Sequence, residues 1–149
     1  MNQGFYFWAL AVAAGSLMVG AAHAGDAIIG DSIACGVASH LPAKHFCRAG
    51  AGSCEIAGWA PHTGAYRRVV ISAGINDSGA CVAALRARIT AREVVWILPA
   101  PINPGRAAVE AAMRPGDRAV NYDCSRGCTK TNFHPGSYSR LTRDIEKVW

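Results

Sequence analysis

The first 24 residues contain no lysine, arginine, aspartate or glutamate. Within them, residues 5–19 form an almost wholly apolar run that is shorter than a typical membrane-spanning helix. Small residues follow at both positions that a signal peptidase reads, Ala22 and Ala24. We therefore predict a signal peptide over residues 1–24, although its positive charge is reduced to the α-amino group, and an exported domain over residues 25–149. An uncleaved membrane anchor is the alternative.

The sequence also lacks the Cys-x2-Cys spacing of a common zinc knuckle, although it has six cysteines. An even number of cysteines in an exported chain indicates disulfides, and a zinc site is the alternative. The simplest pairing joins close neighbours and leaves the remaining two cysteines to each other: Cys47–Cys54, Cys124–Cys128 and Cys35–Cys81.

Aromatic residues are not interleaved with the basic ones in the way that stacks nucleic-acid bases, so we expect no nucleic-acid partner. The whole formal charge of +5 belongs to residues 25–149, because the first 24 residues carry none. Such a basic domain favours an anionic polymer of the cell envelope as a partner, although it also suits a merely soluble protein. Internal repeats and low-complexity tracts are absent, and the length suits one domain with a sizeable core.

Short apolar runs rich in β-branched residues alternate with helical patterns along the domain. Strands are predicted at residues 27–29, 69–72, 94–98 and 118–123, with a weaker one at 45–48. Helices are predicted at residues 81–92, 105–114 and 135–149, where apolar residues recur at helical spacing. Strands that alternate with helices form βαβ units, so we predict an open, doubly wound parallel sheet of four to five strands.

Polar residues follow several of these strands at the point where each strand ends. Ser32 follows the first strand, Asn76 follows the second, and His134 precedes the last helix. Sites in parallel sheets lie outside the carboxyl ends of the strands, so we expect these side chains to meet at one edge. Histidine can take the proton of a serine near neutral pH, and an asparagine amide with a backbone N–H, such as that of Gly52, can stabilise an oxyanion. This residue set is typical of a hydrolytic site.

Four segments resemble, in order, the sequence blocks of the SGNH or GDSL-type serine hydrolases: GDSI at 30–33, AGSC at 51–54, GIND at 74–77 and HPGSYSRL at 134–141. The resemblance spans residues 27–142. It implies a three-layer α/β/α flavodoxin-like sandwich, with Ser32 as the nucleophile and His134 as the base. It also implies an oxyanion hole made of the Ser32 and Gly52 N–H groups and the Asn76 amide, with Gly50 as the alternative glycine, and it implies no metal or other cofactor.

The chain departs from the family pattern at one position. The last block of the family has an aspartate three residues before the histidine, where this sequence has Thr131. A threonine hydroxyl can hold the histidine tautomer, but it carries no charge to stabilise an imidazolium. Three outcomes follow: an unsupported dyad of Ser32 and His134, support from the carboxylate of Asp123, or a degenerate site.

These features predict a secreted or periplasmic serine esterase that hydrolyses a small or carbohydrate-linked ester through an acyl-serine intermediate. The alternative is a catalytically degenerate binding module of the cell envelope with the same fold. After cleavage we expect no stable membrane span. Asp77 is predicted to cap the helix that follows it. Trp59 is predicted to be a core or surface aromatic, with a place in a substrate cleft as the alternative.

Overall fold

The computed structural model describes residues 25–60, 66–122, 124 and 133–149. The signal peptide predicted at residues 1–24 lies outside these residues and stays a prediction, as do the roles of Asp123 and Thr131 and the pairing Cys124–Cys128, which involves Cys128. None of the described helices is long and apolar enough to cross a membrane.

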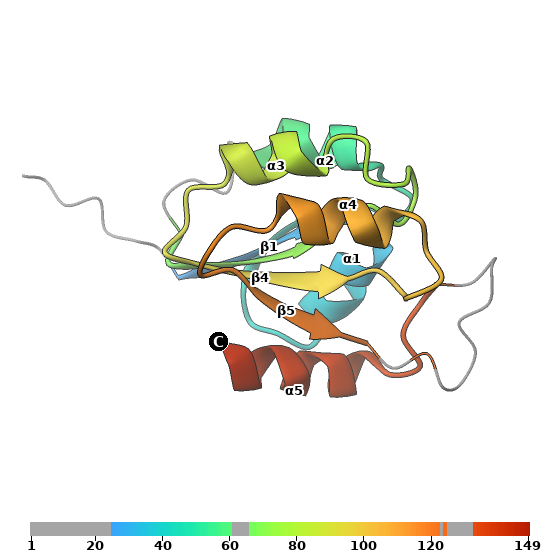
Figure 1. The fold of residues 1–149 in the computed structure, drawn as a ribbon. Coiled ribbons are helices and arrows are strands. Elements are labelled where there is room, and N and C mark those ends of the chain that lie inside the picture. The colour runs from blue at the N-terminus through green and yellow to red at the C-terminus, as the bar shows by residue number, and fades with distance from the viewer. Residues whose placement is uncertain (1–24, 61–65, 123, 125–132) are drawn as a thin grey trace, which may run out of the picture.

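Within the described residues, five parallel strands form one sheet in the order β2-β1-β3-β4-β5 (Figure 1). The strands are β1 (Asp26–Gly30), β2 (Lys44–Cys47), β3 (Arg68–Ser72), β4 (Glu93–Leu98) and β5 (Arg118–Asn121). The chain moves outward in one direction from β1 to β2 and in the other from β1 through β3 to β5. The strand order therefore switches between β1 and β3, which is where parallel sheets of this kind bind their ligands.

Helices cover both faces of the sheet and complete three layers (Figure 1). On one face lie α2 (Ser53–Trp59), α3 (Val82–Arg88) and α4 (Gly105–Ala112). On the other face lie α1 (Ser32–Ala38) and α5 (Tyr138–Val148). The structure thus confirms the predicted α/β/α flavodoxin-like sandwich with a parallel sheet of four to five strands.

The strands bury side chains on both faces, which explains their continuous apolar character. Ile29, Ile71 and Trp96 belong to the core beneath α2, α3 and α4. Their neighbours in the strands point the other way, so that Ile28 and Val70 belong to the core beneath α1 and α5. Each of these five side chains is fully buried.

Two helices are absent from the sequence prediction. Both α1 (SIACGVA) and α2 (SCEIAGW) are seven residues long and lack the contrast between an apolar side and an arginine-bearing side that marks α3, which has the same length. The signal for α1 is its capping residue, because the Asp31 carboxylate accepts a hydrogen bond from the Ile33 N–H at 3.0 Å. An aspartate directly after a buried strand is therefore the mark of a helix start here.

A buried ion pair joins α3 to the turn before β5. The Arg86 guanidinium donates to both carboxylate oxygens of Asp117 at 2.7 Å, and the Trp96 indole N–H donates to one of them at 3.0 Å. Burial would raise the pKa of Asp117, but the hydrogen bonds from Arg86, the Arg114 backbone and Trp96 hold it below its ordinary value. The ion pair and the core therefore stabilise the same face of the sheet.

The substitution Asp117→Ala is expected to lower the free energy of unfolding by about 3 kcal/mol, because it leaves the buried Arg86 guanidinium without its partner. Denaturant unfolding measures this change. The matched control is Glu110→Ala, which removes a half-exposed partner of Arg106 four residues away on α4 and should cost less than about 1 kcal/mol. Equal losses in the two variants would contradict the prediction.

Candidate active site

Ser32 is the first residue of α1, and only Asp31 separates it from the end of β1. The turn before it depends on Gly30, which has a φ of +151° and whose added Cβ would lie 2.0 Å from the Ser72 carbonyl oxygen. The same carbonyl accepts a hydrogen bond from the Asp31 N–H at 3.1 Å. The close approach of the ends of β1 and β3 thus places Ser32 at the switch point of the sheet.

Ser32 and His134 are in contact although 102 residues separate them in the chain. The Ser32 Oγ lies 2.7 Å from the His134 Nε2, which is hydrogen-bonding distance. The packing of α5 on α1 brings the loop of His134 to this place. A Cβ on Gly36 would lie only 2.1 Å from the Tyr138 ring, so the two helices approach closely one turn after His134.

The loops after β2 and β3 meet beside this pair. The Asn76 amide donates a hydrogen bond from Nδ2 to the Ala51 carbonyl oxygen at 2.9 Å. Gly52 follows Ala51 and is the capping residue of α2, so its backbone lies next to the Asn76 side chain. Gly50, the alternative glycine, lies one residue before Ala51, in the turn after β2, with a φ of +78°. The Asn76 side chain and the glycine loop, residues 48–52 between β2 and α2, therefore lie at the same edge of the sheet.

Asp77 binds the start of α2. Its Oδ2 accepts hydrogen bonds from the Ser53 N–H at 2.5 Å and from the Ser53 hydroxyl at 2.8 Å. Its Oδ1 accepts one from the Gly79 N–H at 3.2 Å. The prediction that Asp77 caps the following helix is wrong, because the capping residue of α3 is Cys81, and no side chain caps that helix. The loop after β3 instead directs the carboxylate across to α2.

Four of the described cysteines form two disulfides, Cys35–Cys47 and Cys54–Cys81. The predicted pairings Cys47–Cys54 and Cys35–Cys81 are therefore wrong. The physical reason is the layer in which each cysteine lies. Cys35 in α1 and Cys47 pack on the α5 side of the sheet, whereas Cys54 in α2 and Cys81 before α3 lie on the other side. Each disulfide joins cysteines on the same side of the sheet, and the sheet separates the partners of both predicted pairs.

The two disulfides hold the glycine loop at both of its ends. Cys47 precedes the loop and is bonded to α1, and Cys54 follows it and is bonded to the segment before α3. Ser53 adds a third link, because its hydroxyl also accepts a hydrogen bond from the Cys81 N–H at 2.8 Å. The position of the Gly52 N–H is thus set by its surroundings before any ligand binds.

Asn103 holds the Asn76 loop from the side of β4. This buried side chain donates to the Ile75 carbonyl oxygen at 3.2 Å and accepts from the Gly105 N–H at 2.8 Å. Sequence reasoning missed Asn103, and the signal that points to it is an asparagine two residues before a glycine that starts a helix. The loop after β4 therefore contributes to the site indirectly.

Asp31 is a fully buried carboxyl group beside Ser32. Its Oδ1 accepts hydrogen bonds from the Ile33 N–H and, at 2.8 Å, from the Ser72 hydroxyl, whereas its Oδ2 is buried without a hydrogen-bond partner among the described residues. Burial raises the pKa of Asp31 to about 6, although the hydrogen bonds from Ser72 and Ile33 act to lower it. Sequence reasoning assigned no role to this group.

Trp59 is half-buried, packs against the core beneath α2, and lines a surface groove with Phe46 and Cys47. No group of three or more histidine, cysteine, aspartate or glutamate side chains within the described part of the chain is placed to hold a metal ion.

Comparisons with known proteins bear on the fold. No family model and no curated protein matches the sequence. Among solved structures, the chain is similar to the C-terminal catalytic domain of Streptococcus pneumoniae peptidoglycan O-acetyltransferase A, with a TM-score of 0.58 and 14% identity over 84% of this chain and 92% of that one. It is also similar to a GDSL-like lipase from Bacteroides thetaiotaomicron, with a TM-score of 0.60 and 17% identity over 83% and 86%. The chain therefore has an SGNH/GDSL-type fold.

The substitution Asp31→Asn is expected to change how stability depends on pH. Because the pKa of Asp31 is raised from 3.8 to about 6, the folded protein holds a proton that the unfolded chain releases between these values. The free energy of unfolding therefore falls as pH rises through this window, and the loss persists above it. Asparagine still accepts the hydrogen bonds from Ile33 and Ser72 but carries no charge, so the variant lacks this fall.

Denaturant unfolding at about pH 4.5 and about pH 7.5 measures the effect, which should favour the variant at the higher pH by about 2 kcal/mol relative to the lower one. If the stability difference between the two proteins is the same at both pH values, the raised pKa of Asp31 is contradicted.

Proposed function

We propose that this chain is an exported serine esterase that hydrolyses a small or carbohydrate-linked ester through an acyl-serine intermediate. The observation that carries the proposal is the 2.7 Å contact between Ser32 Oγ and His134 Nε2 at the switch point of an SGNH/GDSL-type sheet. A serine hydroxyl becomes a useful nucleophile when a base within hydrogen-bonding reach takes its proton.

In the proposed reaction, His134 accepts the Ser32 proton at Nε2 while Oγ attacks the ester carbonyl carbon. The bond to the alcohol oxygen then breaks, the alcohol leaves with the proton from His134, and the acyl group stays on Ser32. Water next attacks the acyl-serine and gives a proton to His134, which returns it to Ser32 as the acid is released. The same histidine thus acts in both halves of the reaction.

The negative charge on the carbonyl oxygen needs donors that are already in place. One N–H of the Asn76 amide holds the Ala51 carbonyl oxygen, which orients the amide so that its second N–H can donate to the oxyanion. The Gly52 and Ser32 N–H groups are the other two proposed donors. The disulfides and the bonds between Ser53 and Asp77 support this role, because donors that do not reorganise stabilise a transition state best.

Transfer of the acyl group to a hydroxyl in place of water is the second candidate. The pneumococcal structure is named as an O-acetyltransferase, and the site of the present chain is open enough for an acceptor, because Ser32 is partly exposed and His134 is exposed. Both reactions use Ser32 and His134 in the same roles and differ only in what attacks the acyl-serine.

Export and a carbohydrate or anionic envelope polymer as partner are part of the proposal. Two disulfides among the described cysteines favour an oxidising compartment, and the net charge of +5 favours anionic surroundings.

The proposal predicts that the protein hydrolyses p-nitrophenyl acetate and that a fluorophosphonate probe labels Ser32. The substitution Ser32→Ala should lower kcat by at least about 1,000-fold and abolish labelling. The matched control is Ser39→Ala at the far end of α1, where the exposed hydroxyl donates to the Gly36 carbonyl oxygen and activity should be kept. Wild-type turnover no greater than that of Ser32→Ala, with no labelling, would refute the proposal. An added alcohol that appears as its acetyl ester would identify transfer.

A separate test asks which residue, if any, orients His134 and stabilises its imidazolium form. If the dyad works unaided, Thr131→Asp should raise kcat, because an aspartate at this position stabilises the imidazolium. If Asp123 supplies that charge, Asp123→Asn should lower kcat markedly instead. Steady-state kinetics with p-nitrophenyl acetate distinguish the two cases. Unchanged rates in both variants would show that neither residue orients His134 and would favour the degenerate binding module.

A further inference from the structure

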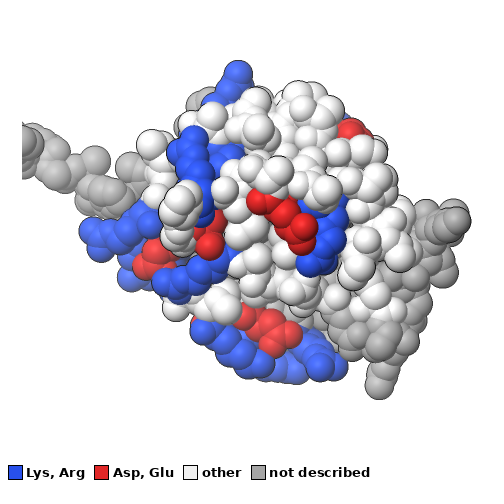
Figure 2. All heavy atoms as spheres, in the orientation of Figure 1, with Lys and Arg blue, Asp and Glu red and all other residues white. Residues whose placement is uncertain are grey.

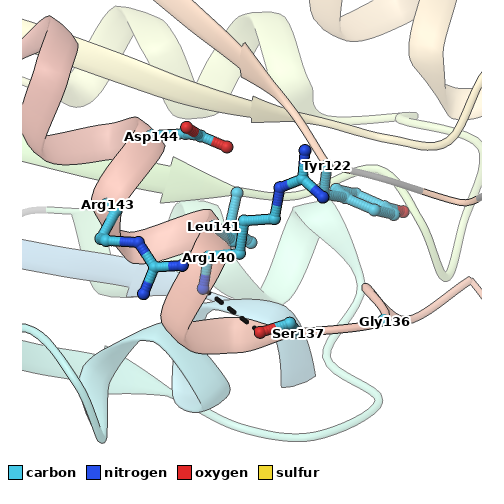
Figure 3. A pocket seen from close by; sticks show the side chains of 7 residues that line it. All are labelled: Tyr122, Gly136, Ser137, Arg140, Leu141, Arg143 and Asp144. Carbon is cyan, nitrogen blue, oxygen red and sulfur yellow. Dashed lines mark hydrogen bonds between the residues drawn. The ribbon is translucent and has the colours of Figure 1, made fainter.

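A cavity of about 170 Å³ lies at the start of α5 (Figure 3). The side chains around it that concern the argument are those of Tyr122, Ser137, Arg140, Arg143 and Asp144. Gly136 also lines the cavity and is two residues from His134, so their Cα atoms are at most about 7 Å apart. An ester held at Ser32 therefore has this cavity as a neighbour on the His134 side.

The cavity is electropositive. Arg140 and Arg143 contribute guanidinium groups, and Asp144 is the acidic residue among the described residues of the lining. The Asp144 carboxylate accepts a hydrogen bond from Lys147 at 2.7 Å. That bond, together with the charges of Lys147, Arg140 and Arg143, holds the pKa of Asp144 below its ordinary value. Lys and Arg side chains gather around acidic ones on the surface over α5 (Figure 2).

The two arginines reach opposite sides of the cavity. The Arg140 side chain extends toward Tyr122, at the end of β5, and Arg143 extends away from it (Figure 3). The Arg140 backbone N–H donates to the Ser137 hydroxyl at 3.3 Å, which holds the first turn of α5. A guanidinium group presents paired N–H donors that match the oxygens of a carboxylate or a phosphate.

We propose that this cavity binds an anionic group, a carboxylate or a phosphate, in the alcohol portion of the substrate. The inference rests on the proposed function and narrows its substrates to esters carried by an anionic molecule. Arg140 is the specificity residue, because it lies closer in the chain to His134 than Arg143 does. The net charge of +5 supports the same class of substrate by attracting anions to the protein as a whole.

The test compares three acetyl esters: 4-acetoxybenzoate, 4-acetoxyphenyl phosphate and the uncharged 4-acetoxybenzamide. The first and the last have nearly the same shape and differ in charge, and the first two distinguish a carboxylate from a phosphate. We expect Arg140→Gln to raise KM about tenfold for at least one anionic ester, since one charge-assisted hydrogen bond is lost. The kinetics with 4-acetoxybenzamide should stay unchanged.

The matched control is Arg92→Gln. Arg92 is an exposed arginine directly before β4, at the opposite edge of the sheet, so its loss changes the net charge equally without touching the cavity. This variant should keep the wild-type KM for all three esters. A rise in KM in both variants would assign the effect to the overall charge and would overturn the proposal, as would an equal effect of Arg140→Gln on charged and uncharged esters.

A binding measurement separates this inference from the proposed function. In the Ser32→Ala background no ester is turned over, so calorimetry reports the affinity for 4-acetoxybenzoate, 4-acetoxyphenyl phosphate and 4-acetoxybenzamide directly. Tighter binding of at least one anionic ester, lost on the further change Arg140→Gln, supports the anion site even if the wild type proves inactive. Equal affinity for all three overturns it, whatever the activity.

Discussion

The close approach of the carboxyl ends of β1 and β3 is the contact on which the site depends. Gly30 has no Cβ to strike the Ser72 carbonyl oxygen, so the Asp31 N–H reaches that oxygen and the Ser72 hydroxyl reaches the Asp31 carboxylate. With both bonds made, α1 begins at once and Ser32 occupies its first turn. A larger residue in place of Gly30 would separate the strands at the point where the chain must turn.

This junction has a cost in stability. It buries the Asp31 carboxyl group with one oxygen unpartnered among the described residues. The raised pKa of Asp31 reflects this loss of solvation. Such groups are common at functional sites, where the arrangement of the residues takes precedence over stability. The core beneath α2, α3 and α4 and the paired Arg86 and Asp117 supply stabilisation away from the site.

The glycine loop illustrates how a small domain keeps irregular backbone in place. Between β2 and α2 the chain has only a few residues and no regular structure, yet a disulfide flanks it on each side. From the next loop, the Asn76 amide binds this segment and the Asp77 carboxylate binds the first residue of α2. The loops that contribute to the site therefore restrain one another, and the sheet carries them all at one edge.

The sequence by itself determined the strands, the helices α3, α4 and α5 and the residues that follow the strands, because these depend on local patterns of apolar and polar residues. The strand at residues 69–72 and the position of Ser32 after the first strand are of this kind. Only the tertiary structure decided the disulfide pairing, the helix that Asp77 caps, the contact of His134 with Ser32, and the cavity that Tyr122 forms with α5. Each of these depends on which layer of the sandwich a residue enters and on contacts between segments far apart in the chain. Local spacing carries no information about such contacts.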